Sequence, residues 1–179
     1  MDTPKKRYVW KELRSPVGRL KLVASDEGLA AVLWENDRPQ RVPMHVAEAD
    51  DNHPVLREAE RQLTEYFARR RTTFDLPLDP CGTPFQQQVW DALRTIPFGE
   101  TRSYQQIASQ IGRPKAVRAV GAANGRNPLS IVAPCHRVIG ATGHLTGFAA
   151  GLETKAYLLE LEGSLTGCLP EDAATPSRR

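Results

Sequence analysis

The sequence predicts a mixed α/β fold in which a small strand-rich domain precedes a mainly helical one. Two observations support this. Between residues 8 and 34, short apolar stretches are separated by turn-forming residues, which is typical of antiparallel strands. Beyond residue 54, apolar residues recur at helical spacing. A segment rich in proline and glycine marks a boundary, so the expected parts are residues 1–80, residues 81–163 and a disordered tail, 164–179.

The first domain is expected to hold a small sheet and one helix. Turns are predicted at residues 15–18 and 25–28, where Ser, Pro, Gly and Asp gather. Residues 35–52 are polar and are predicted to form a loop. Apolar residues repeat every three or four positions from Pro54 to Arg70, which predicts a helix packed on the sheet.

Four helices are predicted in the second domain, at residues 85–96, 104–111, 115–124 and 153–162. The second begins with a capping box, because Ser103 can accept the amide of Gln106 while the Gln106 side chain reaches back. Gly112 suits the C-terminal cap of this helix. The third helix is expected to begin at Pro114, a residue favoured at the first helical position.

The two middle helices, with a tight glycine-containing turn between them, form a candidate helix-turn-helix, although an ordinary helical hairpin fits the same spacing. The second of the pair is made of small residues around one long side chain, Arg118. Reading bases in the major groove usually takes several long polar side chains. Small residues instead let a helix backbone approach DNA closely, in the minor groove for example. This pattern predicts binding without sequence readout.

Positive charge is concentrated in the second half of the chain. Residues 1–80 carry fourteen Lys or Arg and fourteen Asp or Glu, whereas residues 81–163 carry eight and five. Between Thr101 and Leu152 there is no Asp or Glu at all. This distribution favours a local anion-binding surface over a generally basic protein. A solvated charged face is the alternative.

Several classes of protein are disfavoured by composition. The three cysteines are widely and irregularly spaced, without a CxxC pair, and the four histidines complete no ligand pattern, so no metal is expected. No apolar run approaches the ~20 residues that a membrane span needs, and no secretory signal is visible. A cytoplasmic protein without membrane attachment is expected.

Cys135 and His136 follow an apolar stretch and join a candidate nucleophile to a candidate base. An unperturbed thiol, with a pKa of about 8.5, is mostly protonated at neutral pH and needs a base to react. If the segment is extended, neighbouring side chains point to opposite faces, so the imidazole would reach the thiol through a water or a backbone bend. A carboxylate should hold the imidazole, and the later acids are Glu153, Glu160 and Glu162. A buried structural cysteine is the alternative.

Five segments together resemble the O6-alkylguanine-DNA alkyltransferase family, the methylated-DNA–protein-cysteine methyltransferases. Their order and spacing agree with that family over residues 83–163, and the first domain agrees more loosely, at residues 15–18 and 28–29. The five segments are SYQQIA at 103–108, PKAVRAVG at 114–121, NP at 127–128, PCHRV at 134–138 and LLELEG at 158–163. The resemblance implies a non-catalytic ribonuclease H-like domain followed by a winged helix-turn-helix-like domain that carries the thiol.

The resemblance also implies a function, DNA repair by direct reversal of damage. The alkyl group of O6-alkylguanine in double-stranded DNA would pass irreversibly to Cys135, once per molecule and without a cofactor. The DNA would be bound in its minor groove, largely without regard to sequence. The target base would be flipped out, because its reacting oxygen lies inside the base stack. The sequence leaves open whether O4-alkylthymine is also repaired and whether molecules associate with one another on DNA.

By the same resemblance, Cys135 is the acceptor, His136 acts as base through a water, Glu162 orients His136, and Asn127 braces the segment as a hinge. Arg118 would replace the extruded base, and Tyr104 would crowd the phosphate 3′ to it. The full set of expected DNA contacts is Tyr104, Gln105, Ala116, Val117, Arg118 and Gly121. The expected pocket residues are Val138, Phe148, Ala149, Ala150 and Gly151.

The pocket loop departs from the family pattern. Phe148 lacks a phenol hydroxyl that could donate to the guanine oxygen, so stabilisation of the leaving group would fall to backbone amides. The methyl of Ala150 would narrow the pocket against bulky adducts.

Three alternative functions are a non-catalytic sensor of alkylated bases, a cysteine hydrolase and a helix-turn-helix transcription factor. The presence of Cys135 disfavours the sensor, and the small-residue helix disfavours the transcription factor.

Overall fold

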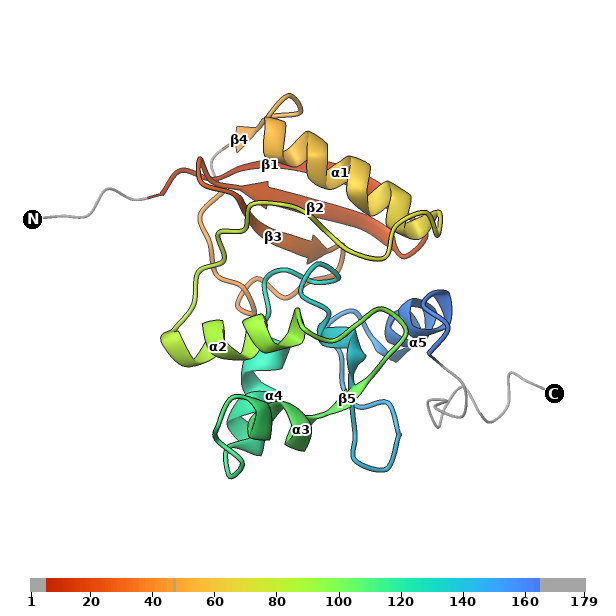
Figure 1. Cartoon of the computed structure of the whole chain (residues 1–179). Coiled ribbons are helices and arrows are strands. Elements are labelled where there is room, and N and C mark those ends of the chain that lie inside the picture. The colour runs from red at the N-terminus through yellow and green to blue at the C-terminus, as the bar shows by residue number, and fades with distance from the viewer. Residues whose placement is uncertain (1–5, 47, 165–179) are drawn as a thin grey trace, which may run out of the picture. The chain divides into compact units, whose positions relative to one another are not determined.

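The computed structural model describes residues 6–46 and 48–164, and the chain divides into two compact units (Figure 1). Unit 1 runs to Cys81 and unit 2 begins at Gly82. The tail predicted to be disordered lies, apart from Ser164, outside the described residues. No helix in the described part of the chain is long and apolar enough to cross a membrane.

Unit 1 contains a four-stranded sheet of order β3-β2-β1-β4. Strands β1 (Val9–Ser15), β2 (Gly18–Ala24) and β3 (Leu29–Trp34) are antiparallel neighbours, as the apolar stretches and turns predicted. The short strand β4 (Glu48–Ala49) pairs parallel with β1 and lies in a segment predicted to be loop. That prediction was wrong because both residues of β4 are exposed and join the sheet through their backbone, which leaves no hydrophobic pattern in the sequence.

Helix α1 (Pro54–Phe67) lies against the sheet of unit 1 (Figure 1). Its fully buried residues include Leu56, Leu63 and Tyr66, which recur at helical spacing. The predicted helix is confirmed but ends three residues early, because Arg69 takes a left-handed backbone angle (φ 62°) that an α-helix cannot continue.

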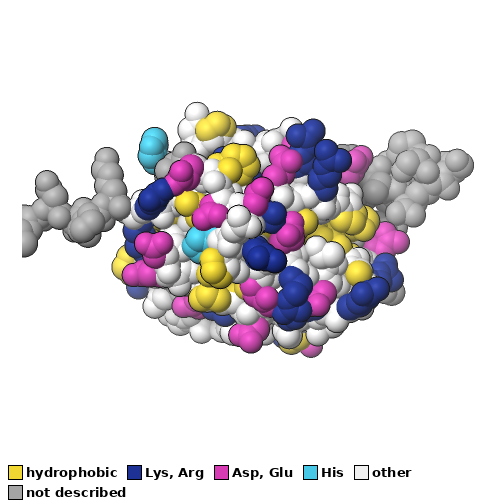
Figure 2. All heavy atoms as spheres, turned by 90° about the horizontal axis from the view of Figure 1, so that it is seen from above, with side chains coloured by type: hydrophobic (Ala, Val, Ile, Leu, Met, Phe, Trp, Pro, Cys, Tyr) yellow, Lys and Arg dark blue, Asp and Glu magenta, His cyan; other side chains and the backbone are white. Residues whose placement is uncertain are grey.

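Charges of both signs are intermingled on the face of the molecule that Figure 2 shows. Figure 2 views the molecule from the side of β4 and α1, and Lys and Arg side chains stand beside Asp and Glu across that face. No broad area of one sign is seen there. This mixture agrees with the equal numbers of basic and acidic residues in residues 1–80. The face in view therefore offers no extended anion-binding patch.

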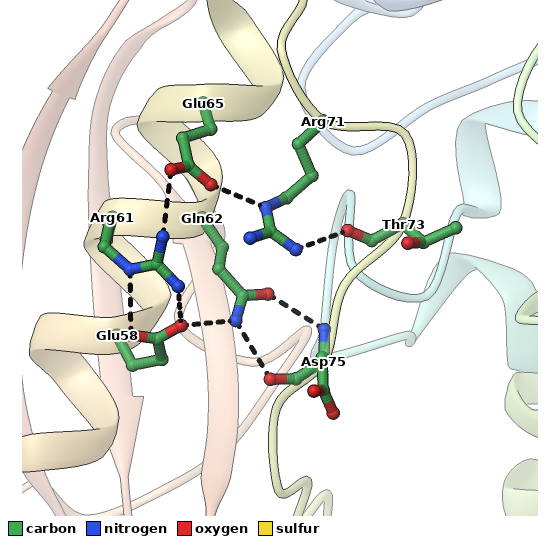
Figure 3. A network of polar contacts seen from close by, with 7 residues as sticks. All are labelled: Glu58, Arg61, Gln62, Glu65, Arg71, Thr73 and Asp75. Atoms are coloured by element: carbon green, nitrogen blue, oxygen red, sulfur yellow. Dashed lines mark hydrogen bonds and ion pairs between the residues drawn. The ribbon is translucent and has the colours of Figure 1, made fainter.

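One network on α1 fastens the segment that follows the helix (Figure 3). The Gln62 side chain, 2% exposed, donates to the carbonyl of Asp75 and accepts from its amide, both at 2.9 Å. Arg61 pairs with Glu58 one turn earlier, and Glu65 pairs with Arg61 and Arg71. The Arg61 guanidinium and the Gln62 amide lower the pKa of Glu58 to about 2.

Unit 2 is mainly helical, which completes the predicted fold class. Its helices are α2 (Pro84–Leu93), α3 (Tyr104–Gln110), α4 (Val117–Gly125) and α5 (Leu152–Leu161). Two short strands, β5 (Arg102–Ser103) and β6 (Val138–Ile139), pair in parallel, and a 3-10 turn, η1 (Cys135–Arg137), precedes β6. Cys135 belongs to the same buried cluster as Trp90, Leu93, Ile107 and Val120.

Local capping explains where these helices begin. The predicted capping box at α3 is confirmed, with Ser103 and Gln106 bonded reciprocally. A second box, Thr83 with Gln86, starts α2; its T-x-x-Q pattern was readable in the sequence, although we did not predict it. Helix α4 begins at Val117, so the prediction from Pro114 was wrong. Residues 113–116 form a turn instead, in which the amide of Ala116 donates to the carbonyl of Arg113 at 2.9 Å.

Candidate active site

Cys135 lies in a backbone bend. It opens η1, in which the amide of Arg137 donates to the carbonyl of Pro134 at 2.9 Å. Neighbouring side chains in a 3-10 turn do not alternate between opposite faces as they do in a strand. Cys135 is 4% exposed and His136 is completely buried. The bend is therefore the alternative, left open by the sequence, that the structure adopts.

The segment before the cysteine is held by Asn127, which is completely buried. Its amide nitrogen donates to the carbonyl of Ala133 at 2.7 Å, and its oxygen accepts from the amide of Leu129 at 3.0 Å. Ile131 within this segment has φ +73°, an angle that a β-branched residue rarely adopts. Its side chain is 1% exposed, so packing and the Asn127 bonds hold a strained backbone just before the thiol.

Glu162 joins His136 and Arg137 in a buried cluster. Oε2 of Glu162 lies 2.8 Å from Nε2 of His136, and Arg137 donates to both carboxylate oxygens at 2.8 and 2.9 Å. Arg137 also donates to the carbonyl of Ile96 at 2.6 Å. Glu162 is the C-terminal cap of α5, and Gly163, with φ +76°, turns the chain away directly after it. The end of α5 and η1 thus meet at one carboxylate, and Arg137 ties both to Ile96.

The charge states in this cluster follow from burial and contact. Burial by itself would raise the pKa of Glu162, but the interactions with His136 and Arg137 outweigh it and lower the pKa to about 2. Burial lowers the pKa of His136, and the Glu162 carboxylate only partly opposes this. A neutral His136 whose Nε2–H donates to Glu162 carries its lone pair on Nδ1. Nδ1 is buried and makes no hydrogen bond with the described residues, so it can accept a proton.

Lys155 on α5 is a completely buried lysine that our sequence analysis missed. Its ammonium donates to the carbonyls of Val138 (2.7 Å) and Thr146 (3.2 Å) and lies 5.9 Å from the ring centroid of Phe148. Burial lowers the pKa of Lys155 to about 8, while the negative charge of a Cys135 thiolate acts in the opposite direction. A signal existed, because Lys155 precedes the apolar Leu158 and Leu159 by three and four positions and so shares their helix face.

The predicted pocket residues lie around this lysine and the start of α5. Val138 is buried in β6, and Phe148 is partly buried and packs against the cluster that contains Cys135. Gly151, with φ +94°, caps α5, and Ala149 and Ala150 lie in the turn before it, Ala149 exposed. Val138 and Phe148 are therefore brought to the site, whereas Ala149 is turned to the surface.

The predicted DNA contacts gather on α3 and the start of α4, two helices that pack on each other (Figure 1). Tyr104 and the exposed Gln105 open α3, and the side-chain amide of Gln105 donates to the carbonyl of Pro114 in the connecting turn. Ala116 caps α4, which carries Val117, an exposed Arg118 and Gly121. The described residues contain no group of three or more His, Cys, Asp or Glu placed to hold a metal ion.

Family models, curated relatives and solved structures that are similar to this chain all point to one family. Residues 8–80 match the family described as 6-O-methylguanine DNA methyltransferase, ribonuclease-like domain, and residues 84–164 match its DNA binding domain. A methylated-DNA–protein-cysteine methyltransferase of Methanosarcina acetivorans is 52% identical over 151 residues, 84% of this chain and 95% of the relative. One of Mycobacterium leprae is 49% identical over 85% of this chain and 90% of the relative. The crystal structure of Mycobacterium tuberculosis OGT in complex with DNA has a TM-score of 0.77 and 45% identity, covering 93% of this chain and 97% of that one.

Proposed function

The chain belongs to the 6-O-methylguanine DNA methyltransferase family, and from this premise we propose that Cys135 is the residue that takes the alkyl group. The chain repairs DNA by alkyl transfer, in line with the methylated-DNA–protein-cysteine methyltransferases that it resembles. One observation carries the assignment of Cys135. Its neighbour His136 is a buried imidazole with a carboxylate on one ring nitrogen and no partner among the described residues on the other.

His136 is the base in this proposal. The thiol proton passes through a water to Nδ1, and the resulting imidazolium is stabilised by the Glu162 carboxylate at 2.8 Å from Nε2. Glu162 stays ionised throughout because its pKa is about 2. Arg137 holds this carboxylate in place and also donates to the carbonyl of Ile96, which fixes the guanidinium. A fixed carboxylate keeps the imidazole in the tautomer that has a free lone pair toward the thiol.

Transfer is an in-line displacement at the alkyl carbon. The bond between Sγ of Cys135 and the carbon forms as the bond between the carbon and O6 breaks, and the electron pair of that bond stays on O6. The proton that left the thiol returns through His136 to the guanine, which leaves as the normal neutral base. The product is a stable thioether, so each molecule acts once and no cofactor takes part.

Lys155 is proposed to favour the reactive thiolate. A cation close to a cysteine stabilises its negative charge, and the thiolate in turn acts to raise the pKa of Lys155. The lysine also fixes the carbonyls of Val138 and Thr146, on either side of the residues that connect β6 to the pocket loop. Lys155 therefore stabilises the charge of the thiolate and holds the backbone of the pocket segment in place. Neither role requires the lysine to touch the alkyl group.

Recognition of damaged DNA is assigned to α3 and α4. The small residues Ala116, Val117 and Gly121 would let α4 lie close to the minor groove of double-stranded DNA, largely without regard to sequence. Arg118, exposed and without an ion pair in the described residues, would occupy the space of the flipped base. Tyr104 would crowd the phosphate beside that base, and Gln105 would contact the backbone. Flipping costs less for a damaged, poorly paired base, which contributes selectivity.

The pocket for the flipped guanine is assigned to Val138, Phe148 and the turn through Gly151. Because Phe148 has no hydroxyl, backbone amides of this turn would stabilise the departing oxygen.

A non-catalytic sensor of alkylated bases is not favoured as the function, since the acceptor cysteine is present. Repair of O4-alkylthymine, association of molecules on DNA and a cytoplasmic location stay predictions.

Mass spectrometry of the intact protein and its peptides tests the proposal. After mixing with excess duplex carrying one O6-methylguanine, we expect a gain of one methyl group on the Cys135 peptide, saturating at one per protein. Cys135→Ser should gain nothing yet still bind the duplex. Cys81→Ser, which alters an exposed cysteine of unit 1, is the matched control and should react as the unaltered chain does. Methylation elsewhere, or binding with no gain in mass, would overturn the assignment.

A further inference from the structure

Thr146 connects the helix pair assigned to DNA with the site of the thiol. Its hydroxyl and the phenol of Tyr104 share a hydrogen bond with an oxygen–oxygen distance of 2.8 Å, across 42 positions of sequence. Tyr104 is the first residue of α3, and Thr146 lies in the loop between β6 and α5. Tyrosine and threonine hydroxyls at a protein surface commonly bond to water instead of to each other. The pairing is therefore a specific feature of this site.

The conformation of Thr146 is constrained on three sides. Its carbonyl accepts from the buried ammonium of Lys155 at 3.2 Å. Its methyl lies where Gly140 leaves room, because a Cβ at Gly140 would approach that methyl to 3.3 Å. A β-branched side chain has few χ1 choices, and with the methyl against Gly140 the hydroxyl points to Tyr104. The residue thus holds a lysine through its backbone and a tyrosine through its side chain.

Tyr104 is fixed in the same way from its own side. Its ring packs against the buried cluster of unit 2, and a Cβ at Gly121 on α4 would lie 3.9 Å from the ring edge. Packing of this kind restrains one side of the ring but still allows small rotations about the bonds that join the ring to the backbone. The bond to Thr146 fixes the end of the side chain that reaches beyond the ring.

We propose that Thr146 is a positioning residue for the flipping step. Its hydroxyl holds the phenol of Tyr104 in the place where it meets the duplex, a role that rests on the proposed function of Tyr104. Because the carbonyl of Thr146 also holds Lys155, two hydrogen bonds through one residue link the DNA-binding helices to the surroundings of Cys135. Loss of the hydroxyl alone should impair reaction with a base that must leave a duplex. Reaction with a free base needs no flipping and should depend on the hydroxyl much less.

The test compares single-turnover transfer from two substrates, a duplex with one O6-methylguanine and O6-methylguanine as a free base. Thr146→Val keeps the shape and removes the hydroxyl, and it should slow transfer from the duplex about tenfold, the cost of one lost hydrogen bond, with at most about a twofold change for the free base. Thr146→Ser keeps the hydroxyl but lacks the methyl that orients it, and its duplex rate should lie clearly above that of Thr146→Val. Thr142→Val, at an exposed threonine of the same loop, is the matched control and should behave as the unaltered chain does.

A double-mutant cycle with Tyr104→Phe shows whether the hydroxyl acts through Tyr104. If it does, adding Thr146→Val to Tyr104→Phe slows the duplex reaction no further. Full additivity of the two losses, or equal slowing of duplex and free-base transfer, would overturn the role of Thr146. Failure of the proposed function would look different, because the unaltered chain would then methylate Cys135 with neither substrate.

Discussion

Two carboxylates, one in each unit, are held by a guanidinium and have the same lowered pKa of about 2, yet their surroundings are opposite. The side chains of Glu58 and Arg61 in unit 1 are 38% and 54% exposed (Figure 3). Those of Glu162 and Arg137 in unit 2 are 0% and 6% exposed. Water can replace the partner of Glu58 but cannot reach Glu162. A lowered pKa therefore marks an ion pair in both places, whereas burial decides whether the molecule depends on it.

The two groups also differ in how far their partners lie along the chain. Glu58 bonds to Arg61 and Gln62, one turn away on the same helix. Glu162 bonds to His136 and Arg137, which are 26 and 25 positions away on another element. The first group stabilises a helix surface locally. The second joins α5 to η1 and so places charge beside the reactive residue.

Glu162→Gln is expected to have the largest effect. It removes the charge that supports an imidazolium at His136 and leaves Arg137 buried without a counter-ion. Transfer should slow by at least about 100-fold, and the free energy of unfolding should fall by about 3–5 kcal/mol. Single-turnover kinetics and urea unfolding measure the two. Glu160→Gln, at an exposed acid two residues earlier, is the control, and equal losses in both variants would contradict the special role of the buried carboxylate.

Lys155→Met should slow transfer from free O6-methylguanine about tenfold, because a neighbouring cation changes the population of a thiolate by about that factor. The pKa of Lys155 is lowered to about 8, so its charge is present below that pH and lost above it. The rate of the unaltered chain should therefore decline above about pH 8, and this decline should be missing in the variant. Lys21→Met in unit 1 should keep both the rate and the decline. A rate that rises steadily through pH 9 in the unaltered chain would refute the role of the lysine.

Acid should destabilise unit 2 through the buried cluster. The folded-state pKa of Glu162 is lowered from 4.5 to about 2, so its contribution is complete above about pH 5 and is lost as the pH falls toward 2, amounting to about 3 kcal/mol. The pKa of His136 is also lowered, so the unfolded state takes up a proton first below about pH 6.5, and stability falls in the same direction. Urea unfolding from pH 7 to pH 2 measures the slope, which should be shallower in Glu162→Gln. An identical slope in that variant would assign the acid sensitivity to other groups.

Gln62→Ala tests whether the buried member of the otherwise exposed network on α1 contributes more to stability than its charged neighbours. Gln62 is 2% exposed and satisfies both backbone groups of Asp75, so its removal should lower the free energy of unfolding by about 1–3 kcal/mol. Transfer by the folded protein should be unchanged. A loss indistinguishable from zero would mean that water replaces the glutamine and that this contact behaves like its charged neighbours.

Glu58→Gln is expected to have the smallest effect. The melting temperature and the transfer rate should both stay within measurement error, although the pKa of Glu58 is lowered as far as that of Glu162. Thermal unfolding in low and high salt checks this. A clear drop in melting temperature at low salt would show that the exposed network acts cooperatively, and the contrast between the two carboxylates would then be one of degree.

Much of this arrangement could be predicted from the sequence, where the signal is local. Helical spacing located α1 and α5, and the S-x-x-Q pattern located the start of α3 at Ser103. The adjacent pair Cys135 and His136 stood out directly. By contrast, the residues alone left three acids as partners for His136, and only the family resemblance pointed to Glu162. The choice depends on where α5 ends relative to η1, which no local pattern encodes.

The remaining features depend on tertiary contacts. Strand β4 has two exposed residues and exists because β1 offers it an edge. Helix α4 starts later than expected because residues 113–116 close a turn before it. The hydrogen bond between Tyr104 and Thr146 crosses two elements whose packing is invisible to periodicity. Lys155 is the exception, since its position on the apolar side of α5 could have been noticed.

The position of Glu162 as the cap of α5 has a consequence for how the protein is made. Synthesis runs from the N-terminus, so Cys135 and His136 exist while the 26 positions up to Glu162 are still being added. During that interval the imidazole has no carboxylate to support it, and Arg137 has no counter-ion to draw it into a core. In the proposed mechanism, the growing chain therefore lacks the base that would activate its thiol. If the proposed roles hold, a thiol that reacts only once is activated by a residue synthesised after it, and this activation waits until α5 has folded against η1.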